Sequence, residues 1–380
     1  AWFLAGAAFF LPIKPAPVNL FLLLALLSSF TSGSIRARIA YYCKHPVCIT
    51  AFILVFYLYL TSLFPSSDLK YAGDYATKYL RLLFLPIVAA ILSLQHRPSR
   101  ILDWFSLGVF LSVVASYGVI SGFIESDVPT YFKAHLTHNF FVAVACAWAV
   151  YRIFKADEEM SSLVSRLLVG IAVLTSLINL FVFIPGRSGW ITVFLIPVLI
   201  GFRCLGFKKG FLLAVALGLG ALFLFLTVDV VKTRVLEIFT EFELWSQGSA
   251  LAKETSFGTR MLYWTISTEA ILANPWVGYG LGGVFDSVYQ GSIVRNFDPF
   301  PNPHNQYLLL MLQGGVVALV LYLVFISAIL KTDDGRIILW ITAGVYLVNN
   351  LINSFHYDFA ESLLFVFIIS LGLAQKNECL

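Results

Sequence analysis

The stretch PNPHNQYLLLMLQGGVVALVLYLVFISAILK, residues 301–331, decides the fold class of this chain. It begins with proline, asparagine and histidine and continues as one long apolar run. A helix needs about 20 mostly apolar residues to cross the hydrocarbon core of a bilayer. The stretch therefore predicts a membrane-spanning helix over 304–330, with His304 at the point where a loop enters the membrane.

The composition of the whole chain supports a membrane protein. Of its 380 residues 59% are hydrophobic and 12% are charged, whereas soluble domains carry about 25% charged residues. The five cysteines form no Cys-x-x-Cys pair, so neither a disulfide framework nor a zinc site is expected. No P-loop is present, which argues against nucleotide hydrolysis. We expect no cofactor, no metal and no nucleic-acid partner.

Apolar runs along the chain predict an all-α fold. They indicate a polytopic bundle of about 12 transmembrane helices in one integral membrane domain, 1–380. The twelve runs lie near 1–13, 16–31, 46–63, 79–95, 100–122, 137–154, 163–184, 187–203, 209–229, 304–330, 336–352 and 359–375.

Basic residues predict the orientation, because cytoplasmic loops of membrane proteins are enriched in Lys and Arg. One side collects Arg36, Arg38, Lys44, Arg97, Arg100, Arg152, Lys155, Arg166, Arg203, Lys208, Lys209, Lys331, Arg336 and Lys376. We expect this side to be cytoplasmic. The polar segment 230–303, between the ninth and tenth runs, is then expected outside as one long helical insertion.

The outer segment carries its own helix signals. Apolar residues recur at helical spacing over 232–245, which predicts an amphipathic helix. A hydroxyl cap at Thr255-Ser256 predicts a second helix, which contains Arg260 and stops at Asn274-Pro275. The glycine-rich string over 278–283 resembles a dinucleotide-binding loop, but it follows a helix rather than a strand. A tight turn is the favoured interpretation.

Three outward-facing residues are the main site candidates: Arg187, Arg260 and His304. The ordinary interpretations are a headgroup anchor for Arg187, a solvated surface side chain for Arg260 and a capping histidine for His304. The functional alternative is anion binding, because arginine binds phosphate oxygens in a fork and stays charged. A histidine at a helix N-terminus tends to stay neutral, as a general base must.

Other polar residues rank lower. Asn305 and Tyr307 follow the histidine at the same membrane edge and are possible secondary site residues. His138 lies at the outer start of the sixth run, where a structural role is favoured. Lys78 and Arg81, at the outer end of the fourth run, are cations that would supplement an anion site.

The chain resembles the O-antigen ligase and polymerase superfamily of bacterial membrane glycosyltransferases. The resemblance covers roughly 165–330. Three stretches in this order carry it: Gly186-Arg187-Ser188-Gly189-Trp190; Arg260 through Asn274-Pro275-Trp276-Val277-Gly278-Tyr279-Gly280; and Pro303-His304-Asn305-Gln306-Tyr307-Leu308 with Gly314-Gly315.

The resemblance implies roles for the three main candidates. Arg187 and Arg260 would bind the diphosphate of an undecaprenyl-diphosphate-linked polysaccharide, and His304 would activate the acceptor hydroxyl. The implied reaction is an inverting, metal-independent transfer to the lipid A-core oligosaccharide at the periplasmic face of the bacterial inner membrane, among membrane lipids. O-antigen polymerase, with the same donor, is the nearest alternative. A protein O-oligosaccharyltransferase, which usually has a C-terminal extension, and a non-enzymatic transporter, which usually has mid-span charges, are further alternatives.

Overall fold

The computed structural model describes residues 2–64, 66–67, 69–155, 162–283, 302–332 and 336–375. These residues are helical or irregular, and none of them lies in a strand, so the all-α prediction is confirmed for this part of the chain. The chain divides into two compact units. The first contains residues 1–36, 91–235 and 373–376, and the second contains 37–90, 236–372 and 377–380.

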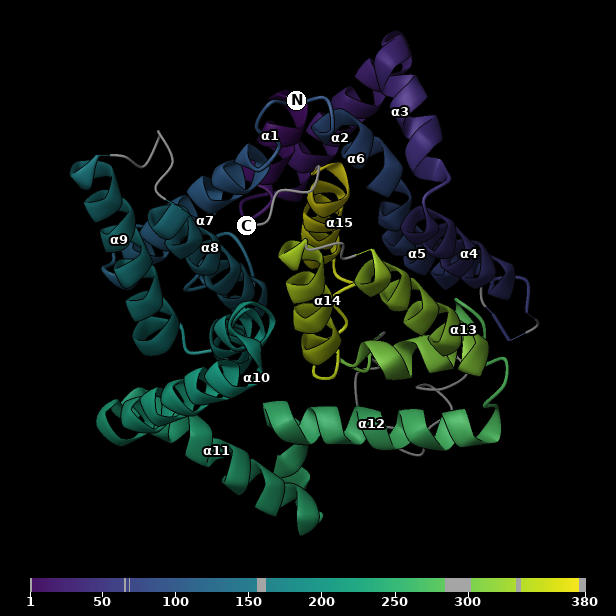
Figure 1. The fold of residues 1–380 in the computed structure, drawn as a ribbon. Coiled ribbons are helices and arrows are strands. Elements are labelled where there is room, and N and C mark those ends of the chain that lie inside the picture. The colour runs from purple at the N-terminus through teal and green to yellow at the C-terminus, as the bar shows by residue number, and fades with distance from the viewer. Residues whose placement is uncertain are drawn as a thin grey trace. The chain divides into compact units, whose positions relative to one another are not determined.

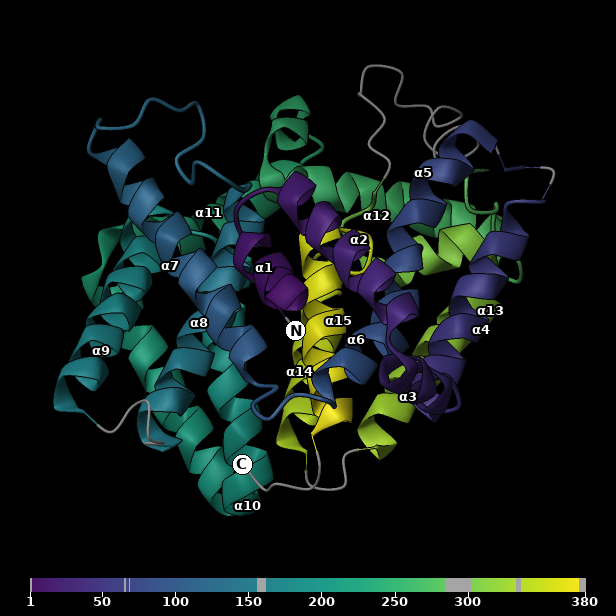
Figure 2. The same cartoon turned by 90° about the horizontal axis from the view of Figure 1, so that it is seen from above.

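The first unit is built from apolar helices that pack side by side. Figures 1 and 2 both show α7, α8 and α9 as neighbours in this unit. Its helices are α1 (Trp2–Phe10), α2 (Pro15–Thr31), α7 (Arg100–Ile120), α8 (His135–Lys155), α9 (Leu163–Ile178), the π-helical turn η3 (Asn179–Phe183) and α10 (Arg187–Thr227).

The long helix α10 reverses direction at Gly206. This residue has φ 75°, outside the helical region. A Cβ on Gly210 would lie 2.8 Å from Cα of Phe202, whereas residues eight apart in a straight helix are separated by about 12 Å. The close contact requires a hairpin of two helices. The structure thus agrees with the separate runs predicted over 187–203 and 209–229.

The second unit contains helices from before, within and after the polar segment 230–303. They are α3 (Gly33–Cys43), α4 (Pro46–Thr61), α5 (Leu69–Tyr79), η1 (Leu80–Phe84), α6 (Leu85–Leu92), η4 (Ala250–Glu254), α12 (Ser256–Ala273), α13 (Gln306–Lys331), α14 (Ile337–Asn349) and α15 (Phe359–Ala374). The helix α11 (Asp229–Ser246) continues from the first unit into the second.

Two helix predictions for the polar segment 230–303 are confirmed. Helix α11 covers the amphipathic stretch, and α12 begins after Thr255, whose side chain accepts a hydrogen bond from the Gly258 backbone N–H at 3.0 Å. Helix α12 ends before Asn274, as predicted. The part of the predicted insertion over 284–301 lies outside the described residues.

Helix α13 is broken at Gly314 and Gly315, within the stretch 304–330 that was predicted as one continuous span. Gly315 has φ 63°, and a Cβ there would lie 2.2 Å from backbone atoms of Trp276. The turn after α12 fills this break, because Tyr279 N donates to Leu312 O at 2.7 Å and Val316 N donates to Pro275 O at 2.9 Å. The glycine-rich string is therefore a turn docked on α13, and α12 lies beside this helix (Figure 1).

The number of spans differs from the prediction. By length and composition, six helices among the described residues can cross a membrane, or seven if the bent pair α2 and α3 counts as one span. The twelve predicted spans are not confirmed, because several of them are short helices. The six long helices include α10 once, although α10 is a hairpin of two helices. The fourth span was also misplaced, since the helical run there covers Tyr71–Leu92 and contains Lys78 and Arg81.

Candidate functional site

The chain enters α13 through a short loop that several hydrogen bonds hold in place. Asn305 caps the helix, because its Oδ1 accepts from the backbone N–H groups of Tyr307 at 3.0 Å and Leu308 at 3.1 Å. Its Nδ2 donates to Leu351 O at 2.9 Å, and Tyr307 donates its hydroxyl to Leu347 O at 2.7 Å. The two predicted secondary residues therefore fasten the loop to the end of α14.

His304 lies just before the cap, in an unusual backbone conformation. Its φ of 51° falls in the left-handed region, which costs a non-glycine residue roughly 1–2 kcal/mol. The His304 N–H donates to Asn302 Oδ1 at 3.0 Å, and Ser354 Oγ donates to the same oxygen at 2.6 Å. Such outliers persist where the surroundings over-determine them, and they cluster at active sites.

The imidazole of His304 is held by Asn353. Nδ1 lies 3.2 Å from Asn353 Oδ1, which can only accept, so Nδ1 carries the hydrogen and Nε2 is the basic nitrogen. Burial lowers the pKa of His304, the Asn353 hydrogen bond partly opposes this shift, and the charge of Arg260 lowers the pKa further. A neutral imidazole near pH 7 is the result.

Helix α12 brings Arg260 to the same place. Trp264 Nε1 donates to Pro303 O at 2.9 Å, so this helix touches the residue directly before His304. Arg260 lies one helical turn earlier on the same face and donates from Nη1 to Ser256 Oγ at 3.0 Å. Its charge acts on the pKa of His304. The structure thus brings two of the three main candidates together within the second unit.

The comparison with known families can now be added to this geometry. Residues 171–323 match the family model described as O-antigen ligase. This stretch is similar to an O-antigen ligase domain and covers about two fifths of the chain. The family resemblance stated from short motifs is confirmed, and the match includes Arg187, Arg260 and His304. No curated protein matches the chain.

Within the matched residues, Arg187 lies in a tightly packed turn of the first unit. It is the first residue of α10 and is half-buried. The Asn139 side chain donates to Ile184 O at 2.8 Å, and a Cβ on Gly186 would collide with the same amide. Trp190 Nε1 closes the turn by donating to Leu180 O at 3.1 Å. The approach of Arg187 to the pair in the second unit stays a prediction.

His138 is fully engaged within the first unit. Nδ1 lies 3.2 Å from Ser112 Oγ and Nε2 lies 3.1 Å from Asn179 Oδ1, so both ring nitrogens have side-chain partners. The residue is 2% exposed. These contacts join α7, α8 and the π-helical turn, and they favour a structural role.

Lys78 and Arg81 lie near two acidic residues. Lys78 Nζ is 3.4 Å from the centroid of the Tyr357 ring, and Arg81 Nη1 donates to Tyr357 O at 3.4 Å. Burial and the neighbouring Glu361 raise the pKa of Asp358 to about 8, whereas Lys78 and Arg81 lower it. The two cations thus act electrostatically on the Asp358 carboxyl group.

Residues that hold His304 were missed by sequence reasoning. Asn302, Asn353 and Ser354 are each no more than 2% exposed, and they fix its backbone or its ring. The signal was the Asn-Asn-x-x-Asn-Ser pattern over 349–354, which is polar between two apolar helices. Among the described residues, no group of three or more His, Cys, Asp or Glu side chains is placed to hold a metal ion.

Proposed function

We propose that this chain is an O-antigen ligase that transfers polysaccharide from undecaprenyl diphosphate to a sugar hydroxyl of the lipid A core. The observation that carries the proposal is the His304 imidazole, held at Nδ1 by Asn353 beside the Arg260 guanidinium, within the stretch that is similar to an O-antigen ligase domain. The proposed site faces the periplasm at the inner membrane, in accord with the distribution of basic residues.

The base in this mechanism is Nε2 of His304. The acceptor hydroxyl gives its proton to Nε2, and its oxygen forms a bond to the anomeric carbon of the donor sugar from the face opposite the diphosphate. The bond between that carbon and the phosphate oxygen breaks with inversion, and its electrons leave with the lipid diphosphate. The imidazolium then releases the proton to solvent.

Arginine supplies the charge that the leaving group needs. Arg260, and Arg187 by the family resemblance, bind the diphosphate oxygens in forked hydrogen bonds. An anion that sits between Arg260 and His304 would raise the pKa of the histidine, opposing the effect of the arginine. The departing diphosphate therefore stabilises the imidazolium that forms as the acceptor is deprotonated.

Reconstitution with purified components tests the proposal. The full chain in detergent is mixed with an undecaprenyl-diphosphate-linked oligosaccharide and lipid A-core, and products are separated on a gel. We expect a glycosylated lipid A-core and at least about a 100-fold loss for His304→Ala. His96→Ala removes an exposed histidine and is the matched control, with unchanged rate.

The other outcomes identify other functions. A lipid-linked chain that lengthens without lipid A-core would identify a polymerase. Transfer to a protein acceptor alone would identify an oligosaccharyltransferase. No product with either acceptor, from a folded chain, would remove the enzymatic proposal. Full activity of His304→Ala would remove the base assignment while leaving the ligase reaction in place.

A further inference from the structure

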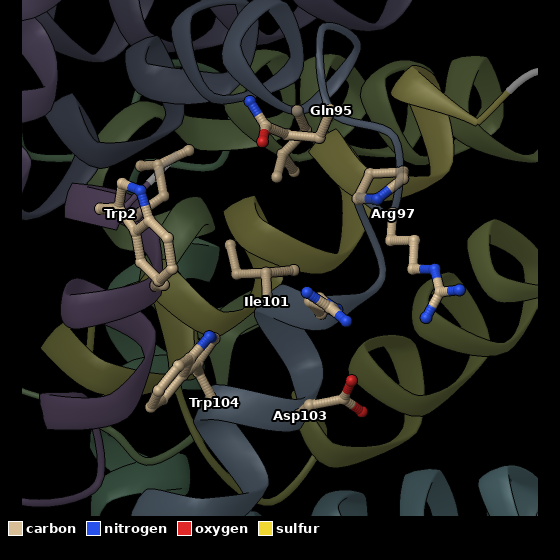
Figure 3. A pocket seen from close by; sticks show the side chains of 11 residues that line it. Trp2, Gln95, Arg97, Ile101, Asp103 and Trp104 are labelled. Atoms are coloured by element: carbon tan, nitrogen blue, oxygen red, sulfur yellow. The ribbon is translucent and has the colours of Figure 1, made fainter. Parts of the chain in front are cut away.

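A pocket lies in the first unit, where α1 and the start of α7 diverge (Figure 3). Its volume is about 510 Å³, within the range of roughly 300–1,000 Å³ that small-molecule sites occupy. The pocket is lined only by residues 2–5 and 92–104, so it belongs to this unit alone. None of the residues assigned to the transfer reaction lines it.

The crossing of the two helices creates the pocket. Gly108 lacks a side chain, and a Cβ there would lie 2.1 Å from Phe9 O, so the two backbones touch at this point. The Phe9 and Trp104 rings meet edge to face at 6.4 Å. The pocket is lined by the first residues of α1, from Trp2 to Ala5, and by residues 92–104, which lead into the first turns of α7.

The lining has an apolar side and a charged side. In Figure 3 the indoles of Trp2 and Trp104 lie on one side, and Arg97 and Asp103 lie on the other. Asp103 is already engaged from α8, because its Oδ1 accepts from Trp148 Nε1 at 2.8 Å and lies 3.7 Å from Arg152 Nε. The lining therefore contains two arginines, Arg97 and Arg100, and one carboxylate that also interacts with Arg152, so arginines outnumber acids in it.

The position of the pocket along the chain sets it at a membrane boundary. One candidate span ends at Leu92 and the next begins at Arg100, so the loop between them lies where the hydrocarbon region ends. Arginine binds phosphate oxygens in a fork, and tryptophan concentrates at the level of lipid headgroups. A ligand with a phosphate next to an apolar chain matches both sides of this lining.

We propose that this pocket binds the headgroup of an anionic phospholipid. The guanidinium groups of Arg97 and Arg100 bind the phosphate, and the indoles of Trp2 and Trp104 cover the glycerol and the first acyl carbons. Because the pocket shares no residue with the His304 site, this lipid is a resident of the protein surface and not the glycosyl donor.

Native mass spectrometry of the full chain in detergent tests the proposal, with phosphatidylglycerol or phosphatidylcholine added. We expect one phosphatidylglycerol molecule to be retained about tenfold more tightly than phosphatidylcholine, whose cationic choline faces the arginines. The double variant Arg97→Gln/Arg100→Gln should lose this preference. The double variant Arg36→Gln/Arg38→Gln removes two exposed arginines elsewhere and should retain it.

A blocking variant and a soluble ligand complete the experiment. Ala5→Phe fills the pocket without changing its charge and should lower phosphatidylglycerol retention about as much as the loss of Arg97 and Arg100. Inorganic phosphate at millimolar concentration should leave the bound lipid in place. Displacement by phosphate would show a site for soluble phosphates and would overturn the lipid assignment. Equal loss from both arginine pairs would also overturn it, because it would indicate general charge attraction.

Discussion

Replacement of Asn353 tests whether its hydrogen bond orients the His304 imidazole for proton transfer. Asn353→Leu has a similar volume but removes the acceptor that lies 3.2 Å from Nδ1 of His304. The Nδ1 hydrogen is then left in a half-buried site without its amide partner, which costs about 1–3 kcal/mol. Since 1.36 kcal/mol corresponds to a factor of ten in rate, we expect transfer to slow by roughly 5- to 150-fold.

Asn353→Asp separates orientation from charge. The carboxylate still accepts from Nδ1, so the rate at the optimum pH should stay within about threefold of the wild type. Its negative charge stabilises the imidazolium and raises the pKa of His304. The base must be neutral, so activity rises as pH increases through this pKa, and the acidic limb of the profile moves to higher pH. Asn353→Leu should move that limb to lower pH, because the wild-type hydrogen bond raises the pKa.

The assay is the pH dependence of kcat/KM for transfer from the lipid-linked donor to lipid A-core by purified protein. Thermal unfolding of each variant is measured beside it as the folding control. A wild-type rate for Asn353→Leu would refute the orienting role. If Asn353→Leu and Asn353→Asp lose the same factor in kcat/KM and the acidic limb of the pH profile does not move, Asn353 only supports the loop.

Three further perturbations test the assignments around the site. Arg260→Gln removes a charge that lowers the pKa of His304. The acidic limb of the pH profile should therefore move to higher pH, and the KM for the donor should rise. An unmoved limb would show that the guanidinium does not act on the imidazole. His138→Leu leaves Ser112 and Asn179 without their hydrogen-bond partner, which costs about 1–3 kcal/mol of folding stability each. The melting temperature should fall, and the transfer rate per folded molecule should stay unchanged. A lower rate at full stability would indicate a role in the reaction. Gly315→Ala places a Cβ against the Trp276 backbone, which fills the break of α13, so the melting temperature should be clearly lower. Gly218→Ala is the control, because the space around Gly218 is open, and its melting temperature should be unchanged or slightly higher.

Local features of the fold were predictable because they depend on nearby residues. The hydroxyl of Thr255 and the Asn274-Pro275 pair set the ends of α12 through capping and through the missing proline N–H, which act over one helical turn. The polar entry to α13 likewise indicated His304. The order of the motifs was sufficient for the family, and the match over 171–323 confirms it.

Long-range features were not predictable from the chain alone. Asn353 is 49 residues from His304, and no periodicity connects a loop residue to a ring that far away. The break in α13 depends on a turn from another helix that supplies hydrogen bonds to its backbone. Lys78 was predicted at a span end because the apolar run begins directly after it. In the structure the face of the Tyr357 ring and the nearby Asp358 accommodate it inside the helical run.

The left-handed backbone at His304 has a practical consequence. A glycine adopts φ 51° without steric penalty, so His304→Gly relieves strain at the same moment as it removes the base. The relieved backbone strain, about 1–2 kcal/mol, would offset part of the cost of losing the contact with Asn353. The resulting protein should be inactive and more stable than His304→Ala. Such a chain could be mixed with both intact substrates and keep them bound without turnover, long enough for the ternary complex to be imaged.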